Sequence, residues 1–117
     1  MIPLLILPVP KPMRIFISGP YSKGDTAINV RDAISAGNYL AGIGHYPFIP
    51  HLNHFWHFLW PNEDINFWYE QDIVWLHQCE ALLRIPGESA GADREVEIAK
   101  EMEIPIYYSV LDVPRVK

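Results

Sequence analysis

The chain has 117 residues, half of them hydrophobic and 13% aromatic, and its formal net charge at pH 7 is −5. This length suits one domain with one core, and the composition excludes an intrinsically disordered chain. The acidic balance argues against a nucleic-acid polymer as partner, because such proteins present a basic stripe to the phosphates. The single cysteine, Cys79, excludes an internal disulfide and suits a reducing compartment, so we expect a cytoplasmic protein.

Residues 1–12, MIPLLILPVPKP, are apolar and rich in proline. The run is too short to cross a bilayer and lacks the positive start of a signal peptide, so we expect no membrane association. We predict an extended N-terminal arm that would cover a sheet edge or a partner subunit. One domain is predicted over residues 13–109, starting at Met13, and residues 110–117 are predicted to be a C-terminal tail.

Strands and helices alternate between these two segments. Apolar runs predict strands over residues 14–18, 46–49, 80–85 and 104–108. Helical periodicity predicts helices over residues 26–41, from 61 to about 78, and from 90 to about 103, with Ser89 as N-cap of the last. Residues 51–60 are predicted to form an aromatic loop or a short helix. This alternation predicts the α/β class: a small doubly wound, flavodoxin/Rossmann-like parallel sheet of four to five strands with helices on both faces.

Two carboxylates lie on helix faces that should be apolar. At about 100° per residue, Glu95 falls on the same arc as Val96 and Ala99, and Asp72 falls among Trp68 and Leu76. A buried carboxylate either finds donors, shifts its pKa or lines a cleft for a ligand. Each acid taken alone is equally compatible with a structural ion pair, whereas two such acids favour a functional site.

In a parallel α/β sheet, ligands bind beyond the carboxyl ends of the strands. Ser89 and Gly91 lie there, at the start of the helix that carries Glu95, where a hydroxyl and free amides can bind an anion or a sugar. The alternative is a capped helix with nothing bound. Lys23, in the loop after the first strand, is better placed than Arg84 to contact a phosphate, and solvated surface charge is the alternative for both.

Histidines and aromatic residues alternate after the second predicted strand. His51, His54 and His57 are spaced three apart, and the first two could share a metal ion, although no third ligand is evident. We favour an aromatic wall in which His51, His54 or Trp56 contacts a base, with plain packing as the alternative. We therefore expect no metal site.

Three segments carry a resemblance to a known family: IFISGPYS, EQDIVWLHQCEALLRIPG and ESAGADREVEIA. They resemble the nucleoside 2-deoxyribosyltransferase superfamily, which includes the 2'-deoxynucleoside 5'-phosphate N-hydrolases, and are most similar to a short branch of domains of unknown function. The resemblance covers most of residues 14–108. Its most specific elements are the Ser-x-Gly-x-x-x-Glu pattern of Ser89, Gly91 and Glu95 and the spacing from Asp72 to the next strand.

The resemblance implies that Glu95 is a nucleophile that attacks the anomeric carbon of a deoxyribose. Asp72 would bind the sugar or assist departure of the base, and Ser89 matches the serine that binds the 5'-phosphate in the hydrolase branch. Gly19, Pro20 and the loop after them would wall the sugar-phosphate site. Covalent catalysis with a second acid nearby agrees with these roles.

The chain departs from the family at two points. Where the family has a tyrosine that orients the nucleophile, the first strand has Phe16 and Ile17, so Tyr21 in the following loop is our candidate for that role. The transferase branch also completes its site with residues near the C-terminus of a neighbouring subunit, and this chain continues only briefly past its last predicted strand.

We therefore expect an enzyme that cleaves or transfers at the N-glycosidic bond of a (deoxy)nucleoside or its 5'-monophosphate. It would need no cofactor and would form a homodimer or a higher homo-oligomer. The alternatives are a catalytically silent nucleotide-binding sensor and an oligomeric interaction domain.

Overall fold

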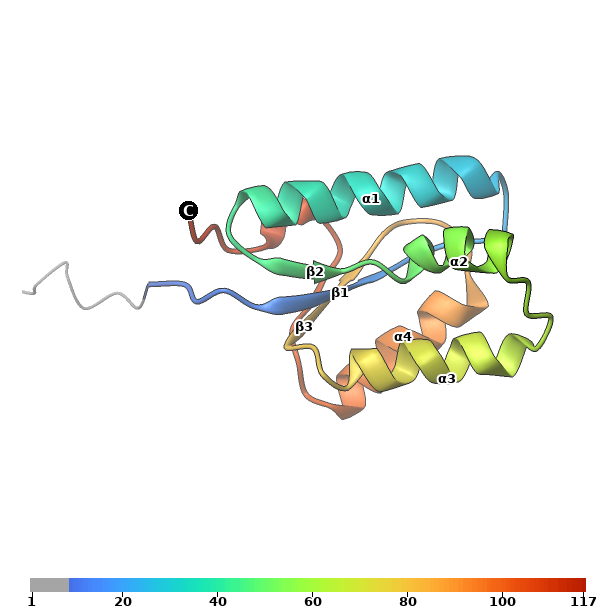
Figure 1. Ribbon diagram of the computed structural model, residues 1–117. Coiled ribbons are helices and arrows are strands. Elements are labelled where there is room, and N and C mark those ends of the chain that lie inside the picture. The colour runs from blue at the N-terminus through green and yellow to red at the C-terminus, as the bar shows by residue number, and fades with distance from the viewer. Residues whose placement is uncertain (1–8) are drawn as a thin grey trace, which may run out of the picture.

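A computed structural model describes residues 9–117 (Figure 1). Its four strands are β1 (Arg14–Ser18), β2 (Tyr46–Phe48), β3 (Ala81–Arg84) and β4 (Ile106–Tyr107). Its helices are α1 (Thr26–Gly42), α2 (Asn53–Leu59), α3 (Ile65–Leu76) and α4 (Ala90–Glu101), with short 3-10 turns η2 (Pro50–Leu52) and η3 (Val110–Asp112). All strand pairs are parallel, in the order β2-β1-β3-β4. The predicted α/β sheet is confirmed.

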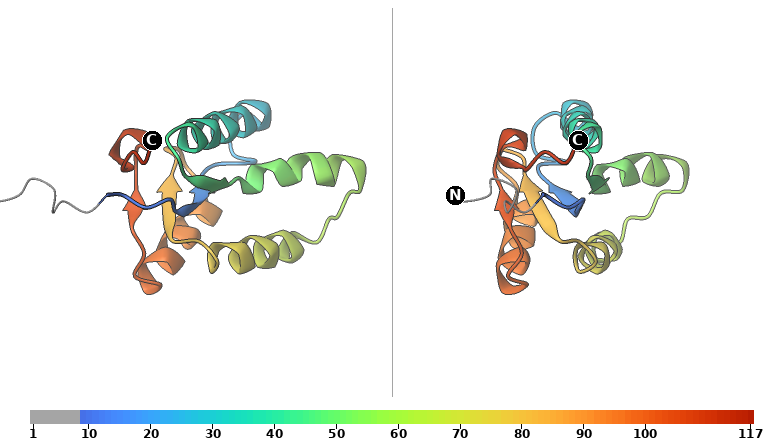
Figure 2. Two further views of the ribbon diagram at one scale, coloured as in Figure 1. Left: turned by 60° about the vertical axis from the view of Figure 1, so that its left-hand side comes forward. Right: turned by 90° about the vertical axis from the view of Figure 1, so that its left-hand side faces the viewer.

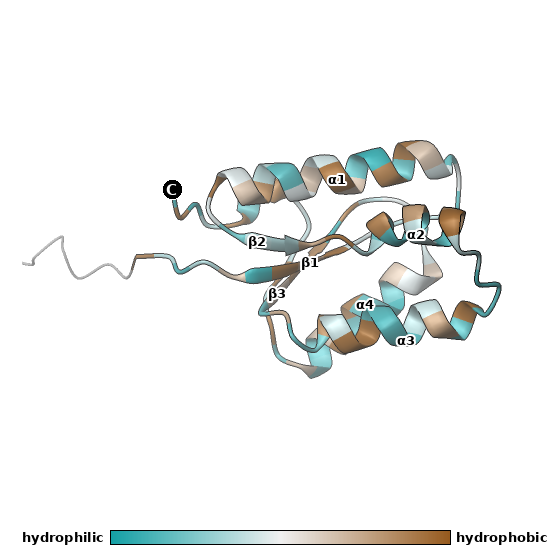
Figure 3. Cartoon of the chain, viewed as in Figure 1, coloured by the Kyte–Doolittle hydropathy of each residue, from teal (hydrophilic) through white to brown (hydrophobic). Residues whose placement is uncertain are grey.

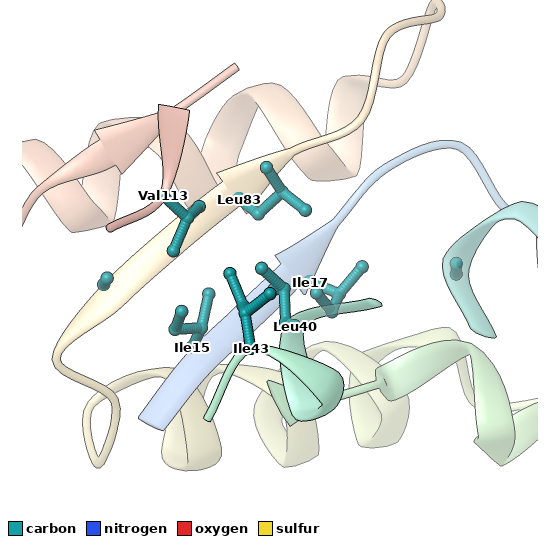
Figure 4. Close-up of a cluster of buried hydrophobic side chains, with 8 residues drawn as sticks. Ile15, Ile17, Leu40, Ile43, Leu83 and Val113 are labelled. Carbon is teal, nitrogen blue, oxygen red and sulfur yellow. The ribbon is translucent and has the colours of Figure 1, made fainter. Parts of the chain in front are cut away.

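Helices cover both faces of the sheet (Figure 2). The alternation of β1 side chains separates two cores. Ile15 and Ile17 pack with Leu40 of α1 on one face, as Figure 4 shows. Phe16 packs with Leu76 of α3 and with α4 residues on the other face. Ser18 follows Phe16 on the α3 and α4 face, so a hydroxyl lies at the end of the strand beside the apolar core of this face.

The element boundaries follow local capping chemistry. Asp25 caps α1 and Ser89 caps α4, as the side chains of both residues accept backbone amides. The α3 helix begins at Ile65 rather than at residue 61, because the Asp64 carboxylate accepts from the Asn66 amide at 3.0 Å and fixes Asp64 as the N-cap. The connection between α2 and α3, residues 60–64, is therefore irregular.

Residues 110–117 were expected to be a tail, but they fold back onto the domain. Val113 is only 5% exposed and joins the core that α1 covers. The amides of Val116 and Lys117 both donate to the Ile43 carbonyl. Apolar residues at every third position explain this packing. Of the predicted arm, residues 9–12 are exposed, and residues 1–8 lie outside the described residues.

Val113→Ala is expected to lower the free energy of unfolding by about 1–3 kcal/mol, because it removes buried methyl groups from the core. Leu111→Ala is the matched control, since Leu111 is 79% exposed in the same segment. Urea unfolding followed by tryptophan fluorescence measures both. Equal stabilities of the two variants would contradict the packing of this segment.

The helices in the described part of the chain are all too short or too polar to cross a membrane.

Candidate active site

A pocket of about 580 Å³ opens beyond the carboxyl ends of β1 and β3. After β1 the chain crosses over to β2 on one side, and after β3 it crosses over to β4 on the other side. The loops that follow these two neighbouring strands therefore diverge and leave a crevice between them. The loop after β1, the η2 and α2 segment, α3 and the N-terminal turn of α4 form its walls. Its volume lies in the range of small-molecule sites.

Glu95 enters this pocket from α4 and is held by the end of β1. The hydroxyl of Ser18, which is fully buried, donates to Glu95 Oε1 at 2.7 Å. The pKa of Glu95 is raised to about 7, chiefly by burial and to a lesser extent by the nearby charge of Asp72. The Ser18 hydrogen bond and the Arg84 guanidinium act against this rise. Both protonation states of the carboxyl group are therefore accessible near neutral pH.

Asp72 reaches the same pocket from α3. Its Oδ1 is buried and has no hydrogen-bond partner within residues 9–117. Burial raises the pKa of Asp72 to about 7 as well. The two carboxyl groups that helical periodicity placed on apolar faces therefore share one cavity instead of pairing with separate basic residues.

Such a pair can divide two chemical roles. One carboxylate can attack an electrophilic carbon while the other group, kept protonated by burial, gives a proton to a leaving group. Acid and base chemistry near neutral pH requires pKa values in this range.

The α4 N-terminus and the β1 loop supply further pocket walls. Ser89 and Gly91 line the pocket, and Ser89 Oγ accepts from the Ala92 amide at 3.1 Å. Gly19 also lines it, and a Cβ at that position would lie 2.9 Å from the Ile85 Cβ, so the chain can pass here only as glycine.

Tyr21 lines the pocket, but its hydroxyl is hydrogen-bonded to His54 Nδ1 at 2.8 Å. The hydrogen bond to Glu95 that we expected from Tyr21 comes from Ser18 instead. Ser18 was missed by sequence reasoning. The available signal was a polar residue in the last position of an apolar strand, immediately before Gly19.

Two predicted substrate-binding residues do not line the pocket. Trp56 packs edge-on against Phe67 and Trp68, and Trp68 takes the place at the pocket wall. The position of Trp56 on α2 directs its side chain toward α3 rather than into the pocket. Pro20 acts through its backbone, since its carbonyl accepts from Nε2 of His51, which is buried and does line the pocket.

The three histidines are held apart by different partners. His57 Nδ1 accepts from the Asn62 amide, whereas His54 contacts Tyr21 and His51 contacts Pro20. Over the described residues, no three histidine, cysteine or acidic side chains gather closely enough to hold a metal ion.

Arg84 does not contact the pocket. Its side chain is 10% exposed, and its guanidinium donates to Asp93 Oδ1 and to the Gly87 carbonyl, both at 2.9 Å. It ties the end of β3 to the first turn of α4. Lys23 does line the pocket, 3.6 Å from Glu88 Oε2.

Comparison with solved structures finds the same fold in an enzyme. A 2-deoxyribosyltransferase from the psychrotolerant bacterium Bacillus psychrosaccharolyticus superimposes with a TM-score of 0.61 at 17% sequence identity. The match covers 80% of this chain and 69% of that chain. At this identity the likeness shows the fold alone. A search of curated proteins found no match.

One family model spans most of the chain, including both carboxyl groups and every pocket wall. It matches residues 13–109 and is described as a domain of unknown function, DUF7768. The chain belongs to the DUF7768 family.

Proposed function

We propose that this protein cleaves or transfers at the N-glycosidic bond of a (deoxy)nucleoside or its 5'-monophosphate. The observation that carries the proposal is the pairing of Glu95 and Asp72, two buried carboxyl groups in one pocket with the first held by Ser18. The fold shared with a 2-deoxyribosyltransferase supports it, since that enzyme is named for chemistry on this kind of bond.

In the proposed first step, Glu95 attacks the anomeric carbon of the sugar. Ser18 holds Oε1, so Oε2 is the attacking atom. A carbon–oxygen bond to Glu95 forms while the carbon–nitrogen bond breaks, and the base leaves with the bonding electron pair. Asp72 in its protonated form supplies the proton that the base takes up. The product is a glycosyl-enzyme ester and a free base.

In the second step, water or another base attacks the same carbon, the ester bond breaks and Glu95 leaves as a carboxylate. Asp72, ionised after the first step, takes the proton that the attacking water or base loses. Water gives hydrolysis and a second base gives transfer. The remaining lining residues would hold the substrate: Gly19, Lys23, Ser89 and Gly91 around the sugar, and His51 at the base. Tyr21 and His54 would close the pocket beside them. These steps use only side chains and need no cofactor.

The test is release of free base, measured by chromatography on a panel of deoxynucleosides, ribonucleosides and their 5'-monophosphates. Each is incubated with the protein, with and without an added acceptor base. Release from any member supports the proposal, and new nucleoside formed with the acceptor identifies transfer. No release from the whole panel would contradict the proposal and favour a silent nucleotide-binding sensor.

Ser18→Ala is expected to lower kcat by about 10- to 100-fold with a smaller change in KM, because it removes a hydrogen bond to a charged catalytic group. The Ser18 hydroxyl lowers the pKa of Glu95, so the substitution should raise that pKa and shift the acidic limb of the pH–rate profile to higher pH. Ser35→Ala, at an exposed position of α1, is the control. An unchanged pH profile would contradict the positioning role of Ser18.

A second candidate function is assembly through an aromatic surface beside the pocket. This aromatic surface consists of exposed side chains of α2 and the start of α3: Phe55, Phe58, Leu59, Trp60 and Ile65. Figure 3 shows the apolar residues of α2 at this end of the molecule. Exposed apolar patches of this kind mark interaction sites. We propose that it joins copies of the chain, and light scattering of wild type and Trp60→Ser tests this.

A further inference from the structure

The pocket carries an excess of negative charge. Among its described lining residues, Lys23 is the one lysine or arginine, whereas four are acidic: Glu63, Asp72, Glu88 and Glu95. Even with Asp72 and Glu95 both protonated, Glu63 and Glu88 outnumber Lys23. A phosphate monoester carries up to two negative charges at neutral pH, so the pocket opposes it.

Glu88 acts on the one lysine of the pocket wall. Its Oε2 lies 3.6 Å from Lys23 Nζ, and both side chains are mostly exposed. An exposed ion pair of this kind is weak. Glu88 matters because its negative charge lies at the pocket wall beside Lys23. That charge offsets the positive charge of Lys23 whether or not the two side chains stay in contact.

The neighbouring arginines are engaged elsewhere. Arg84 donates to Asp93 Oδ1 and to the Gly87 carbonyl, so its charge is already paired. Arg94 lies over the ring of Tyr69, 5.9 Å from its centroid. Neither side chain lines the pocket.

The N-terminus of α4 is also partly neutralised. Ser89 accepts hydrogen bonds from two amides of the first turn: its hydroxyl accepts from the Ala92 amide and its carbonyl from the Asp93 amide. Glu88 lies immediately before this cap, and its carboxylate offsets the positive end of the helix dipole, which otherwise favours a bound anion.

We propose that Glu88 is a specificity-determining residue that excludes 5'-phosphorylated substrates, so that the pocket takes uncharged nucleosides. This inference rests on the proposed function and narrows its substrate class. The sugar 5'-hydroxyl is uncharged, so the excess of acidic residues around the pocket does not oppose it, whereas a 5'-phosphate adds up to two negative charges.

The experiment compares one deoxynucleoside with its own 5'-monophosphate by isothermal titration calorimetry and by initial rates of base release. Three proteins are used: wild type, Glu88→Gln and the matched control Glu97→Gln. Glu97 lies on α4, exposed and paired with Lys100, so its variant makes the same charge change away from the pocket.

Wild type is expected to bind the nucleoside at least about tenfold more tightly than the monophosphate, because like charges at short range oppose binding. Glu88→Gln should strengthen monophosphate binding by about fivefold or more and leave nucleoside binding nearly unchanged. Glu97→Gln should change neither. Added salt should narrow the wild-type preference, because it screens exposed charges.

Tighter binding of the monophosphate by wild type would overturn this inference, and so would equal effects of Glu88→Gln and Glu97→Gln. Base release from either ligand would leave the proposed function standing in those cases. If no nucleoside or monophosphate of the full panel bound or reacted, the proposed function would fail, and the inference would fail with it.

Discussion

Glu95→Gln is expected to lower the rate of base release by more than about 10³-fold while the fold is retained. The amide keeps the size of the side chain and can still accept the Ser18 hydrogen bond at its oxygen. It cannot form the ester that the first step requires, because a neutral amide is a poor nucleophile. Steady-state rates on the best substrate of the panel, with circular dichroism as the check of folding, measure this effect.

Glu97→Gln is the matched control, because it removes a carboxylate two residues along α4 on the exposed side. Mass spectrometry adds an independent readout. Rapidly quenched wild type should carry a sugar adduct on the peptide that contains Glu95, and the Glu95→Gln protein should carry none. A Glu95→Gln variant with wild-type rates would remove Glu95 from the mechanism, even if the protein were an N-glycosidic enzyme.

The positions of both carboxyl groups could be predicted because they depend on local geometry. Helical periodicity alone places Glu95 beside Val96 and Asp72 beside Leu76, and the strand-helix alternation fixes which end of the sheet they approach. The role of Ser89 as the N-cap of α4 could also be predicted, because its hydroxyl accepts from the amide of Ala92, only three residues along the chain.

The partners of those groups could not be predicted in the same way. Ser18 and Glu95 are 77 residues apart, and their contact requires the register of β1 against β3 and the seating of α4 on the sheet. The exchange of Trp56 for Trp68 at the pocket wall depends on how two short helices pack. Contacts of this kind join distant parts of the chain, so hydrophobic periodicity in the sequence does not predict them.

The burial of the C-terminal segment could not be predicted from its composition. Residues 110–117 contain a proline and several charges, which are typical of a tail, yet Val113 is buried and Val110 packs against the same core. Val113 packs in one cluster with Ile15 and Ile43, which come together only when α1 lies on the sheet. Composition describes a segment by itself, whereas burial depends on the surface it meets.

The same burial that prepares the site for chemistry should weaken the fold as the pH rises from about 4 to about 7. The pKa of Asp72 rises from 3.8 to about 7 on folding. Below the lower value, both folded and unfolded chains hold the proton, and the folded state has its full stability. Between the two values the unfolded chain ionises first, so stability falls as pH rises, and above about pH 7 the loss is complete. Glu95, with its pKa also raised to about 7, acts in the same direction.

Asp72→Asn is therefore expected to be more stable than wild type by about 1–3 kcal/mol at about pH 8, and this gain should shrink toward pH 4. The substitution keeps the shape of the side chain and removes a charge whose Oδ1 has no partner in the described structure. Urea unfolding followed by tryptophan fluorescence at both pH values measures it. Asp32→Asn, an exposed position on α1, should stay within about 0.5 kcal/mol of wild type. A destabilised Asp72→Asn protein at pH 8 would mean that Asp72 is a structural acceptor. A stabilised and inactive one would mean that the fold tolerates this buried charge because the reaction requires it.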